Sequence, residues 1–168
     1  MPTERESRLA RKVYNAMRNL LEKMGVRYLE HEEELVLTCT VRGEDIPMDL
    51  LIFIHEEQQL VRILSPMPFV VPEKKRVDMA VAVSTVNYGL VDGSFDYDIS
   101  DGSLRFRLTS SFRESILGEE LLKYLFMVTT FITDEYNDRF MLLAKGVITL
   151  EQFLEKARPE EKPAAPSE

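Results

Sequence analysis

The run Gly93-Ser-Phe-Asp-Tyr-Asp-Ile-Ser-Asp-Gly-Ser-Leu-Arg-Phe-Arg-Leu-Thr-Ser110 predicts a β-hairpin. Apolar residues alternate with polar ones on both sides of Asp101-Gly102, which is the period of two that half-buried strands show. Asp-Gly is among the strongest short turn signals, because a type I′ turn requires positive φ at both central residues. We therefore expect two antiparallel strands joined by a two-residue loop.

Such a loop sets the register of the hairpin and decides which side chains face each other. On the apolar face, the expected pairs are Ile99 with Leu104, Tyr97 with Phe106 and Phe95 with Leu108. On the other face, they are Asp98 with Arg105 and Asp96 with Arg107. Each charged pair contributes roughly 0.2 to 1 kcal/mol, so the apolar face supplies most of the stabilisation. Cross-strand pairing explains these charged residues without a catalytic role.

The preceding segment, Pro72 to Val91, is apolar on two sides when it is drawn as a helix. One stripe, which we expect to cover the sheet, consists of Met79, Val83, Val86 and Leu90. The second stripe consists of Val77, Ala80, Val81, Ser84, Tyr88 and Val91. The β-branched run Val81 to Val86 also fits a buried strand, but Pro72 at the first helical position and the length of the segment favour a helix.

A helix that is apolar on two sides needs a second partner besides the sheet. That partner is a third helix, a second subunit or a client protein. The candidate protein-binding residues are Val77, Val81, Ser84 and Tyr88.

The part of the chain before this helix predicts a helix and then an antiparallel sheet. Thr3-Glu4-Arg5-Glu6 has the capping-box form and opens a helix that Gly25 can close. Strands are expected at 26–30, 35–42, 48–55 and 60–64, with the short polar connections typical of a meander. Leu51 and Phe53 lie on the second face of their strand, so that face is not simply solvated.

Two helices are expected after the hairpin, at 118–145 and at 150–157, the second capped by Thr149 and Gln152. One side of the long helix carries Leu121, Leu125, Val128, Ile132, Tyr136, Phe140 and Leu143, and the apolar surface of its first half is widened by Leu122, Phe126 and Met127. We assign residues 1–157 to a single domain of the α+β class. Residues 158–168, rich in proline, charged and small residues, are expected to be a disordered tail.

Composition limits the classes of function. The 168 residues are 45% hydrophobic and carry a net charge of −8, which disfavours nonspecific attraction to nucleic acid or anionic membranes. A lone Cys39 excludes an intramolecular disulfide, and we interpret it as a buried structural thiol. No apolar run approaches the ~20 residues needed to cross a bilayer, and no signal segment follows the charged N-terminus, so we expect a cytoplasmic protein.

Motifs for catalysis or cofactor binding are absent from the sequence. His31 and His55 each begin an acidic run, but neither has the His-x-x-x-His spacing of a helical metal site, and we interpret both runs as solvated turns. Asp134 and Asp138 lie on one helix face without a Glu-x-x-His motif. No phosphate loop, nucleophile elbow or triad is present. We expect no catalytic residue, no metal, no cofactor and no enzymatic activity.

One passage combines several structural motifs, namely Met67-Pro68, Val71-Pro72-Glu73, Asn87, Leu90, Gly93-Ser94-Phe95, Asp101-Gly102 and Arg105-Phe106-Arg107. Together with the order of elements over roughly residues 5–157, it resembles the bacterial YbjN family, whose fold is similar to that of class I type III secretion chaperones. The resemblance implies an αβββαββα order, with helices on one antiparallel sheet. It also implies a dimer and a role in protein binding or regulation, with no catalytic residue.

Two functions follow as hypotheses. The first is a chaperone-like or regulatory adaptor module, whose partners are a second copy of the chain and an unidentified client protein, without nucleic acid or membrane. The alternative is a small-ligand sensor with a pocket between the helices and the sheet, which the 8 methionines and 9 phenylalanines could line.

Overall fold

Residues 1–157 are described by the structure, a computed structural model, and form four α-helices and a six-stranded sheet. In chain order the elements are α1 (Glu4–Lys23), β1 (Tyr28–His31), β2 (Val36–Val41), β3 (Met48–His55), β4 (Leu60–Pro66), the 3₁₀ turn η1 (Glu73–Lys75), α2 (Arg76–Gly89), β5 (Ser94–Tyr97), β6 (Leu104–Ser111), α3 (Glu119–Lys145) and α4 (Leu150–Ala157). The predicted tail, 158–168, lies outside the described residues.

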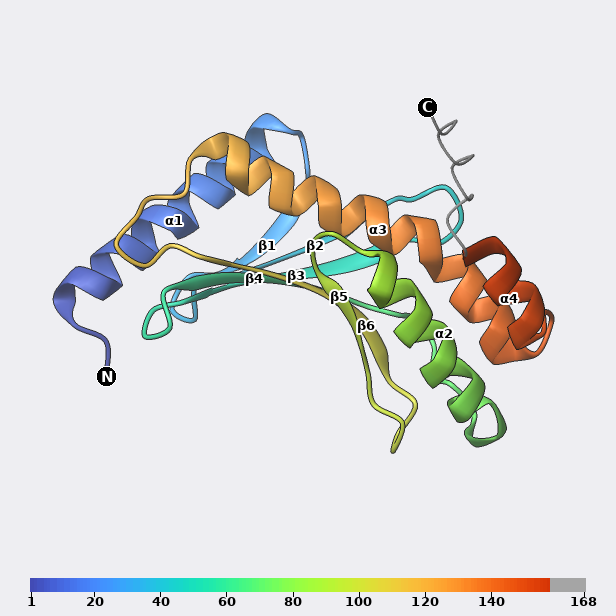
Figure 1. Ribbon diagram of the computed structural model, residues 1–168. Coiled ribbons are helices and arrows are strands. Elements are labelled where there is room, and N and C mark those ends of the chain that lie inside the picture. The colour runs from blue at the N-terminus through green and yellow to red at the C-terminus, as the bar shows by residue number, and fades with distance from the viewer. Residues whose placement is uncertain (158–168) are drawn as a thin grey trace, which may run out of the picture.

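All six strands join in one antiparallel sheet, in the order β1-β2-β3-β4-β6-β5. Helices α1 and α3 lie over one side of this sheet, and α2 lies beside the β5–β6 hairpin (Figure 1). This arrangement confirms the predicted α+β class with helices packed on a single antiparallel sheet. The αβββαββα order that the resemblance implied has three strands before the second helix, whereas the structure has the four that the strand pattern predicted.

Capping interactions begin two helices at the predicted residues. The Thr3 hydroxyl accepts a hydrogen bond from the Glu6 N–H (3.3 Å), and the Glu6 carboxylate accepts one from the Thr3 N–H (2.7 Å). Thr149 and Gln152 exchange the same two bonds at the start of α4, at 3.2 and 2.9 Å. Both predicted caps are therefore confirmed. Each satisfies N–H groups of the first turn, which have no partner within the helix.

The hairpin forms in the predicted segment but in a different register. Its Cα partners are Ser94 with Arg107, Phe95 with Phe106, Asp96 with Arg105 and Tyr97 with Leu104. The predicted two-residue loop is therefore wrong, since the loop spans residues 98–103. The Asp98 carboxylate accepts hydrogen bonds from the N–H and the hydroxyl of Ser100 (2.8 and 2.5 Å), which turns the chain early and leaves Ile99 in the loop. Because the register shifts by two residues, each strand side chain keeps its predicted face.

Contact with the segment that leads into α2 also holds this loop. The Val71 N–H donates to the Gly102 carbonyl (2.9 Å). Gly102 has φ of +82°, and a Cβ on it would lie 2.3 Å from the Val71 oxygen. The turn glycine is therefore required by a tertiary contact as well as by its backbone conformation.

Asn87, near the end of α2, covers part of the outermost strand of the sheet. Its amide nitrogen donates to the Phe95 carbonyl (3.0 Å), and its oxygen accepts from the Phe95 N–H (2.8 Å). An edge strand otherwise presents such groups for pairing with another chain. Asn87 thus occupies part of the β5 edge and holds α2 against the hairpin.

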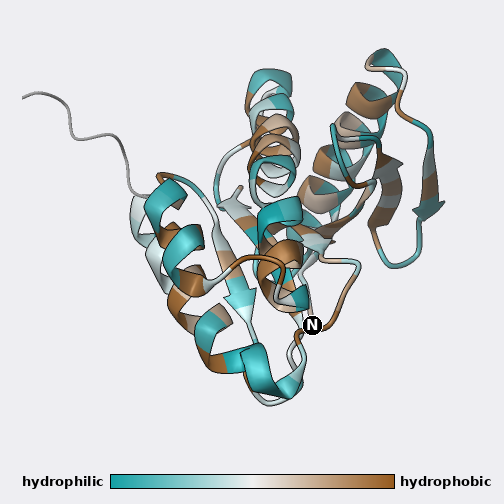
Figure 2. Cartoon of the chain, turned by 90° about the vertical axis from the view of Figure 1, so that its right-hand side faces the viewer, coloured by the Kyte–Doolittle hydropathy of each residue, from teal (hydrophilic) through white to brown (hydrophobic). Residues whose placement is uncertain are grey.

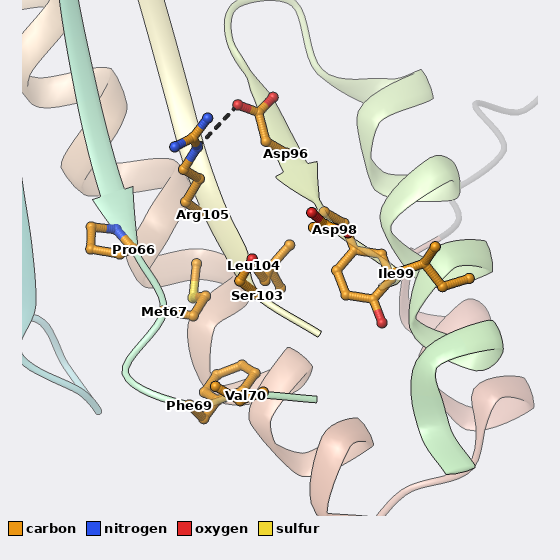
Figure 3. A pocket seen from close by; sticks show the side chains of 11 residues that line it. Pro66, Met67, Phe69, Val70, Asp96, Asp98, Ile99, Ser103, Leu104 and Arg105 are labelled. Atoms are coloured by element: carbon orange, nitrogen blue, oxygen red, sulfur yellow. Dashed lines mark hydrogen bonds and ion pairs between the residues drawn. The ribbon is translucent and has the colours of Figure 1, made fainter. Parts of the chain in front are cut away.

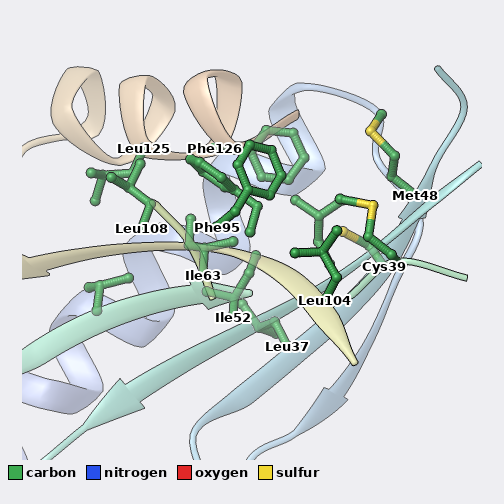
Figure 4. Packing of buried hydrophobic residues seen from close by; sticks show 14 of the residues in the cluster. Leu37, Cys39, Met48, Ile52, Ile63, Phe95, Leu104, Leu108, Leu125 and Phe126 are labelled. Carbon is green, nitrogen blue, oxygen red and sulfur yellow. The ribbon is translucent and has the colours of Figure 1, made fainter. Parts of the chain in front are cut away.

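The hydrophobic core lies between the sheet and the helices. In Figure 4, Leu125 and Phe126 of α3 lie above Ile63 and Leu108 of the sheet. Along the helices, hydrophobic and hydrophilic segments alternate, as expected for helices with one buried face (Figure 2). None of the helices within residues 1–157 combines the length and the apolar content needed to span a membrane.

Aromatic rings connect the hairpin to the C-terminal helices. The centre of the Phe95 ring lies 5.1 Å from that of Phe106, 5.8 Å from that of Tyr136 and 5.0 Å from that of Phe140. Phe153 of α4 stacks on Phe140 at 5.3 Å. Edge-to-face and stacked contacts of this kind add to the free energy gained by burial of the rings.

The buried face of α3 is rotated from the predicted side towards Leu122 and Phe126, which were predicted only to widen the apolar surface. Its buried residues are Leu122, Leu125, Phe126, Thr129, Thr133, Asn137, Phe140, Leu143 and Ala144. Leu121 is 39% exposed instead, and Val128 is only partly buried. The Thr129 hydroxyl donates to the Leu125 carbonyl (2.8 Å), so a threonine can lie inside without an unpaired donor. This rotation leaves other apolar side chains of α3 at the surface.

We expect Gly102→Ala to destabilise the protein more than Gly25→Ala. Both glycines have positive φ, +82° and +69°, but only at Gly102 would the new Cβ meet backbone atoms. The free energy of unfolding, measured by urea denaturation, should fall by about 1 kcal/mol for Gly25→Ala and by more than about 2 kcal/mol for Gly102→Ala. Equal losses would show that the loop is not held against Val71.

Asn87→Ala removes both hydrogen bonds to the backbone of Phe95. The free energy of unfolding should fall by about 1–3 kcal/mol, because partly buried backbone groups lose their partners. Asn15→Ala, at an exposed position of α1, is the matched control and should change it by less than about 0.5 kcal/mol. An Asn87→Ala loss no larger than that of the control would mean that water replaces the amide without cost.

Candidate functional site

The four candidate binding residues lie on one exposed face of α2. Val77 is 69% exposed, Tyr88 is 95% exposed, and Val81 and Ser84 are exposed as well. We call these four residues the α2 stripe. The opposite face of the helix is buried and consists of Met79, Ala82, Val83 and Val86. The expected division of α2 into a core side and a free side is therefore present within residues 1–157.

A second group of exposed apolar side chains lies on α3, close to the C-terminal end of α2. Tyr124, Met127 and Phe131, which we call the α3 patch, are all exposed, and Phe131 is 65% exposed. A surface groove of about 470 Å³ lies between this helix and the loop after α2, with Val91 among its lining residues. The Tyr124 hydroxyl donates a hydrogen bond to the carboxylate of Asp92 in that loop.

Sequence reasoning counted Met127 in the apolar surface of the helix but did not single out the α3 patch. Its residues recur at helical spacing, which is the only signal in the sequence that could have identified them. The same helix carries a second apolar stripe, and the pattern alone does not say which one faces the sheet.

The side of the sheet opposite the helices has no cover from residues 1–157 (Figure 1). Its centre is formed by three neighbouring strands: Leu51 pairs with Leu64, Leu64 with Arg107, and Phe53 with Arg62. These side chains are partly exposed and do not belong to the hydrophobic core. We call Leu51, Phe53, Arg62, Leu64 and Arg107 the open face. The sequence already indicated that the Leu51 and Phe53 side is not simply solvated.

Two neighbours hold Arg62 in place on the open face. Its Nη2 lies 2.7 Å from His55 Nε2, and its guanidinium carbon lies 5.7 Å from the centre of the Phe53 ring. A guanidinium only donates hydrogen bonds, so Nε2 of His55 accepts and the imidazole is neutral. Burial, and then the charge of Arg62, lower the pKa of His55 below its ordinary value of 6.5. Within residues 1–157, Arg62 forms no ion pair with a carboxylate.

Arg105 and Arg107 share a single carboxylate at the hairpin side of the sheet. Arg107 binds Asp96 through two nitrogens (2.8 and 2.9 Å), and Arg105 Nε lies 3.2 Å from the same carboxylate. Burial by itself raises the pKa of Asp96, but the hydrogen bonds and charges of Arg107 and Arg105 lower it overall. The predicted pair of Asp96 with Arg107 thus forms as a diagonal contact, while the predicted pair of Asp98 with Arg105 does not.

A hollow of about 660 Å³ lies where β4 leads towards α2, beside the hairpin. In Figure 3, Met67, Phe69 and Val70 border one side of this hollow, and Asp96 and Arg105, joined by a hydrogen bond, lie on another. Its position at the end of the sheet differs from the pocket between helices and sheet that the ligand-sensor hypothesis expects.

The other residues considered for chemistry lie apart or are paired. His31 in β1 and His55 in β3 are separated by β2, and no three His, Cys, Asp or Glu side chains within residues 1–157 are grouped so as to hold a metal. Asp134 accepts hydrogen bonds from the Glu44 N–H (3.1 and 3.2 Å). Cys39 is buried, and burial raises the pKa of its thiol to about 11, so it is protonated at neutral pH.

Two solved structures have a similar fold. YbjN from E. coli, a candidate transcription regulator, superposes with a TM-score of 0.54 over 75% of this chain and 92% of its own, at 13% sequence identity. A chain of the ExsC–ExsE complex superposes with a TM-score of 0.51 over 77% of this chain and 93% of its own, at 11% identity. No family model and no curated protein matches the sequence. The likeness confirms the YbjN-like and type III secretion chaperone-like fold that the sequence resemblance implied.

We expect the stability of the protein to fall as the pH is lowered below about 6.5, in part through His55. The pKa of His55 is lower in the folded state than its ordinary value, so the unfolded state binds more protons in this pH range. The stability that is fully present above the ordinary pKa is therefore lost as the pH falls through the folded-state pKa. His55→Gln should flatten this part of the profile of unfolding free energy against pH, while His31→Gln should retain it. Identical profiles for His55→Gln and the wild type would exclude the role of His55.

Proposed function

We propose that residues 1–157 form a non-enzymatic protein-binding module of the cytoplasm, chaperone-like or a regulatory adaptor, that acts as a homodimer. The observation that carries the proposal is the α2 stripe, in which three of the four exposed side chains are large and apolar, on a helix whose other face is already buried. Monomeric proteins seldom leave a contiguous apolar surface uncovered, and a partner is its usual explanation.

The dimensions of the stripe suit a second copy of the same helix. From Val77 to Tyr88 it runs for about three turns, or roughly 16 Å, which is enough for two helices to pack along their length. Because a two-fold dimer uses the same patch on both subunits, an apolar stripe can be its own partner. The α3 patch lies beside the C-terminal end of α2 and would enlarge such an interface.

Proteins with this fold also support a binding role. The ExsC–ExsE structure is a complex of two proteins, and YbjN is a candidate regulator of transcription. By this analogy, the present chain would bind a client protein through surfaces that the dimer leaves free. Neither nucleic acid nor membrane is part of the proposal, given the net charge of −8.

A small-ligand sensor is the second candidate, and the hollow beside the hairpin favours it. Its volume of about 660 Å³ suits a drug-sized molecule, and its lining combines apolar side chains with the Asp96–Arg105 pair. A reproducible rise in melting temperature with one compound from a metabolite panel, abolished by Phe69→Ser, would support this function.

Disrupting the α2 stripe should dissociate the dimer. We expect a dimeric mass for the wild type by light scattering and a monomeric mass for Val81→Asp combined with Tyr88→Ala, since a buried aspartate would lack a partner in the interface. Val147→Asp places the same charge at another exposed valine and should leave the dimer intact. A monomeric wild type, or a double variant that dimerises as strongly, would remove the basis for this interface.

A further inference from the structure

The groove between α3 and the loop after α2, which we call the α3 groove, is lined mainly by apolar side chains. Its α3 side carries Tyr124 and Phe131, and its loop side carries Leu90 and Val91. Val91 is 96% exposed and Phe131 is 65% exposed, so large apolar side chains contact water here. The loop lies against α3, where Asp92 accepts a hydrogen bond from the Tyr124 hydroxyl (Figure 1). The groove is thus an exposed apolar surface whose two sides are held together.

The charged residues of the α3 groove are all acidic within the described chain. They are Asp92 and Glu135, and neither forms an ion pair with another residue of 1–157. Arg139, one turn after Glu135, is directed towards α4 instead. Its guanidinium carbon lies 5.3 Å from the centre of the Tyr136 ring and 5.1 Å from that of the Phe153 ring. The negative charge at the groove therefore has no cation paired with it.

The two carboxylates lie near opposite ends of the apolar surface. Asp92 is bound by Tyr124, and Glu135 follows Tyr124 by eleven residues on α3. Eleven residues make about three turns of helix and span roughly 16 Å, so Tyr124 and Glu135 project from the same side of α3. Val128 and Phe131 lie between them and also line the groove. The groove thus presents two negative charges about three helical turns apart, with apolar surface between them.

We propose that the α3 groove binds an amphipathic helix of another protein, whose apolar stripe lies between two basic residues about three turns apart. The stripe covers Val91 and Phe131, and the two cations pair with Asp92 and Glu135. This inference rests on the proposed function only in taking the chain to be a binding module. The α3 patch then serves this partner, and the α2 stripe alone forms the dimer.

A helix fits the α3 groove better than an extended peptide. The backbone groups of α3 are bonded within the helix along Glu119–Lys145, so its middle offers none to an extended chain. On the loop side, the Leu90 N–H already donates to the Asn87 carbonyl (3.3 Å). A helix satisfies its own backbone and gains free energy by packing side chains along α3.

A second copy of the chain is a poorer occupant of the α3 groove. A two-fold contact centred here would bring Asp92 and Glu135 of both copies together without a cation between them. A basic helix from another protein removes this repulsion.

The test uses two model helical peptides of about five turns, each with a leucine stripe between two positions eleven residues apart. Both positions are arginine in one peptide and glutamine in the other. By fluorescence anisotropy, the wild type should bind the arginine peptide about tenfold more tightly, because each of two ion pairs contributes a few-fold. The preference should shrink in about 1 M sodium chloride, since salt screens exposed charges.

Glu135→Gln should reduce the preference for the arginine peptide to about threefold, because one of the two ion pairs is lost. Glu135→Asp keeps the charge and should retain most of the preference. Glu33→Gln, which removes the same charge from the exposed turn between β1 and β2, should leave the preference at the wild-type value. An equal preference in Glu135→Gln and the wild type overturns the inference.

Phe131→Ser should weaken binding of both peptides on the order of tenfold, because large aromatic side chains supply much of the binding energy in such contacts. Leu29→Ser, at a similarly exposed position on β1 (70%), should leave both affinities unchanged. Circular dichroism of each variant checks that it is folded. Failure of the arginine peptide to bind the wild type, or equal weakening by Phe131→Ser and Leu29→Ser, contradicts the proposed site.

Repeating the titration with the Val81→Asp, Tyr88→Ala variant separates the two proposals, because neither residue lines the α3 groove. Peptide binding should persist in this variant. Failure of the peptide to bind a dimeric wild type would overturn only the present inference, and peptide binding by a monomeric wild type would overturn only the proposed dimer. Dissociation of the dimer by Phe131→Ser, without peptide binding, would assign the groove to a contact between copies.

Discussion

The tertiary structure depends above all on the burial of Phe95. Its ring contacts Phe106 on the neighbouring strand and Phe140 on α3, while its backbone is bound at both polar groups by Asn87 of α2. One residue of a four-residue edge strand thus joins the hairpin and two helices. The apolar contacts supply most of the free energy, and the amide of Asn87 fixes the direction in which α2 runs along the hairpin.

Because the helices cover only one side of the sheet, its other side and the outward faces of the helices are left for partners. The helices bury the inward side chains, so α2 and α3 each present a second apolar side outward, and the sheet presents Leu51 and Leu64. Apolar side chains left exposed in this way favour association, because their contact with water is unfavourable.

The shifted pKa values of three side chains follow from their burial and from their charged neighbours. Asp96 is held ionised by two arginines, His55 is kept neutral beside Arg62, and Cys39 is kept protonated by its burial. This distribution is compatible with the proposed binding function and gives His55 a role in positioning Arg62.

Local patterns in the sequence determined the elements of this protein, and tertiary contacts decided how they meet. Capping at Thr3 and the alternation around Asp101-Gly102 depend on residues a few positions apart, so they predicted helix ends, strands and the face of each strand side chain. The hairpin register depended on the Asp98–Ser100 contact and on Val71 packing against Gly102. The rotation of α3 and the placing of Arg62 between Phe53 and His55 required elements distant in the sequence. Such contacts are decided by how whole helices and strands pack, because a periodic pattern identifies an apolar side but not the surface that will cover it.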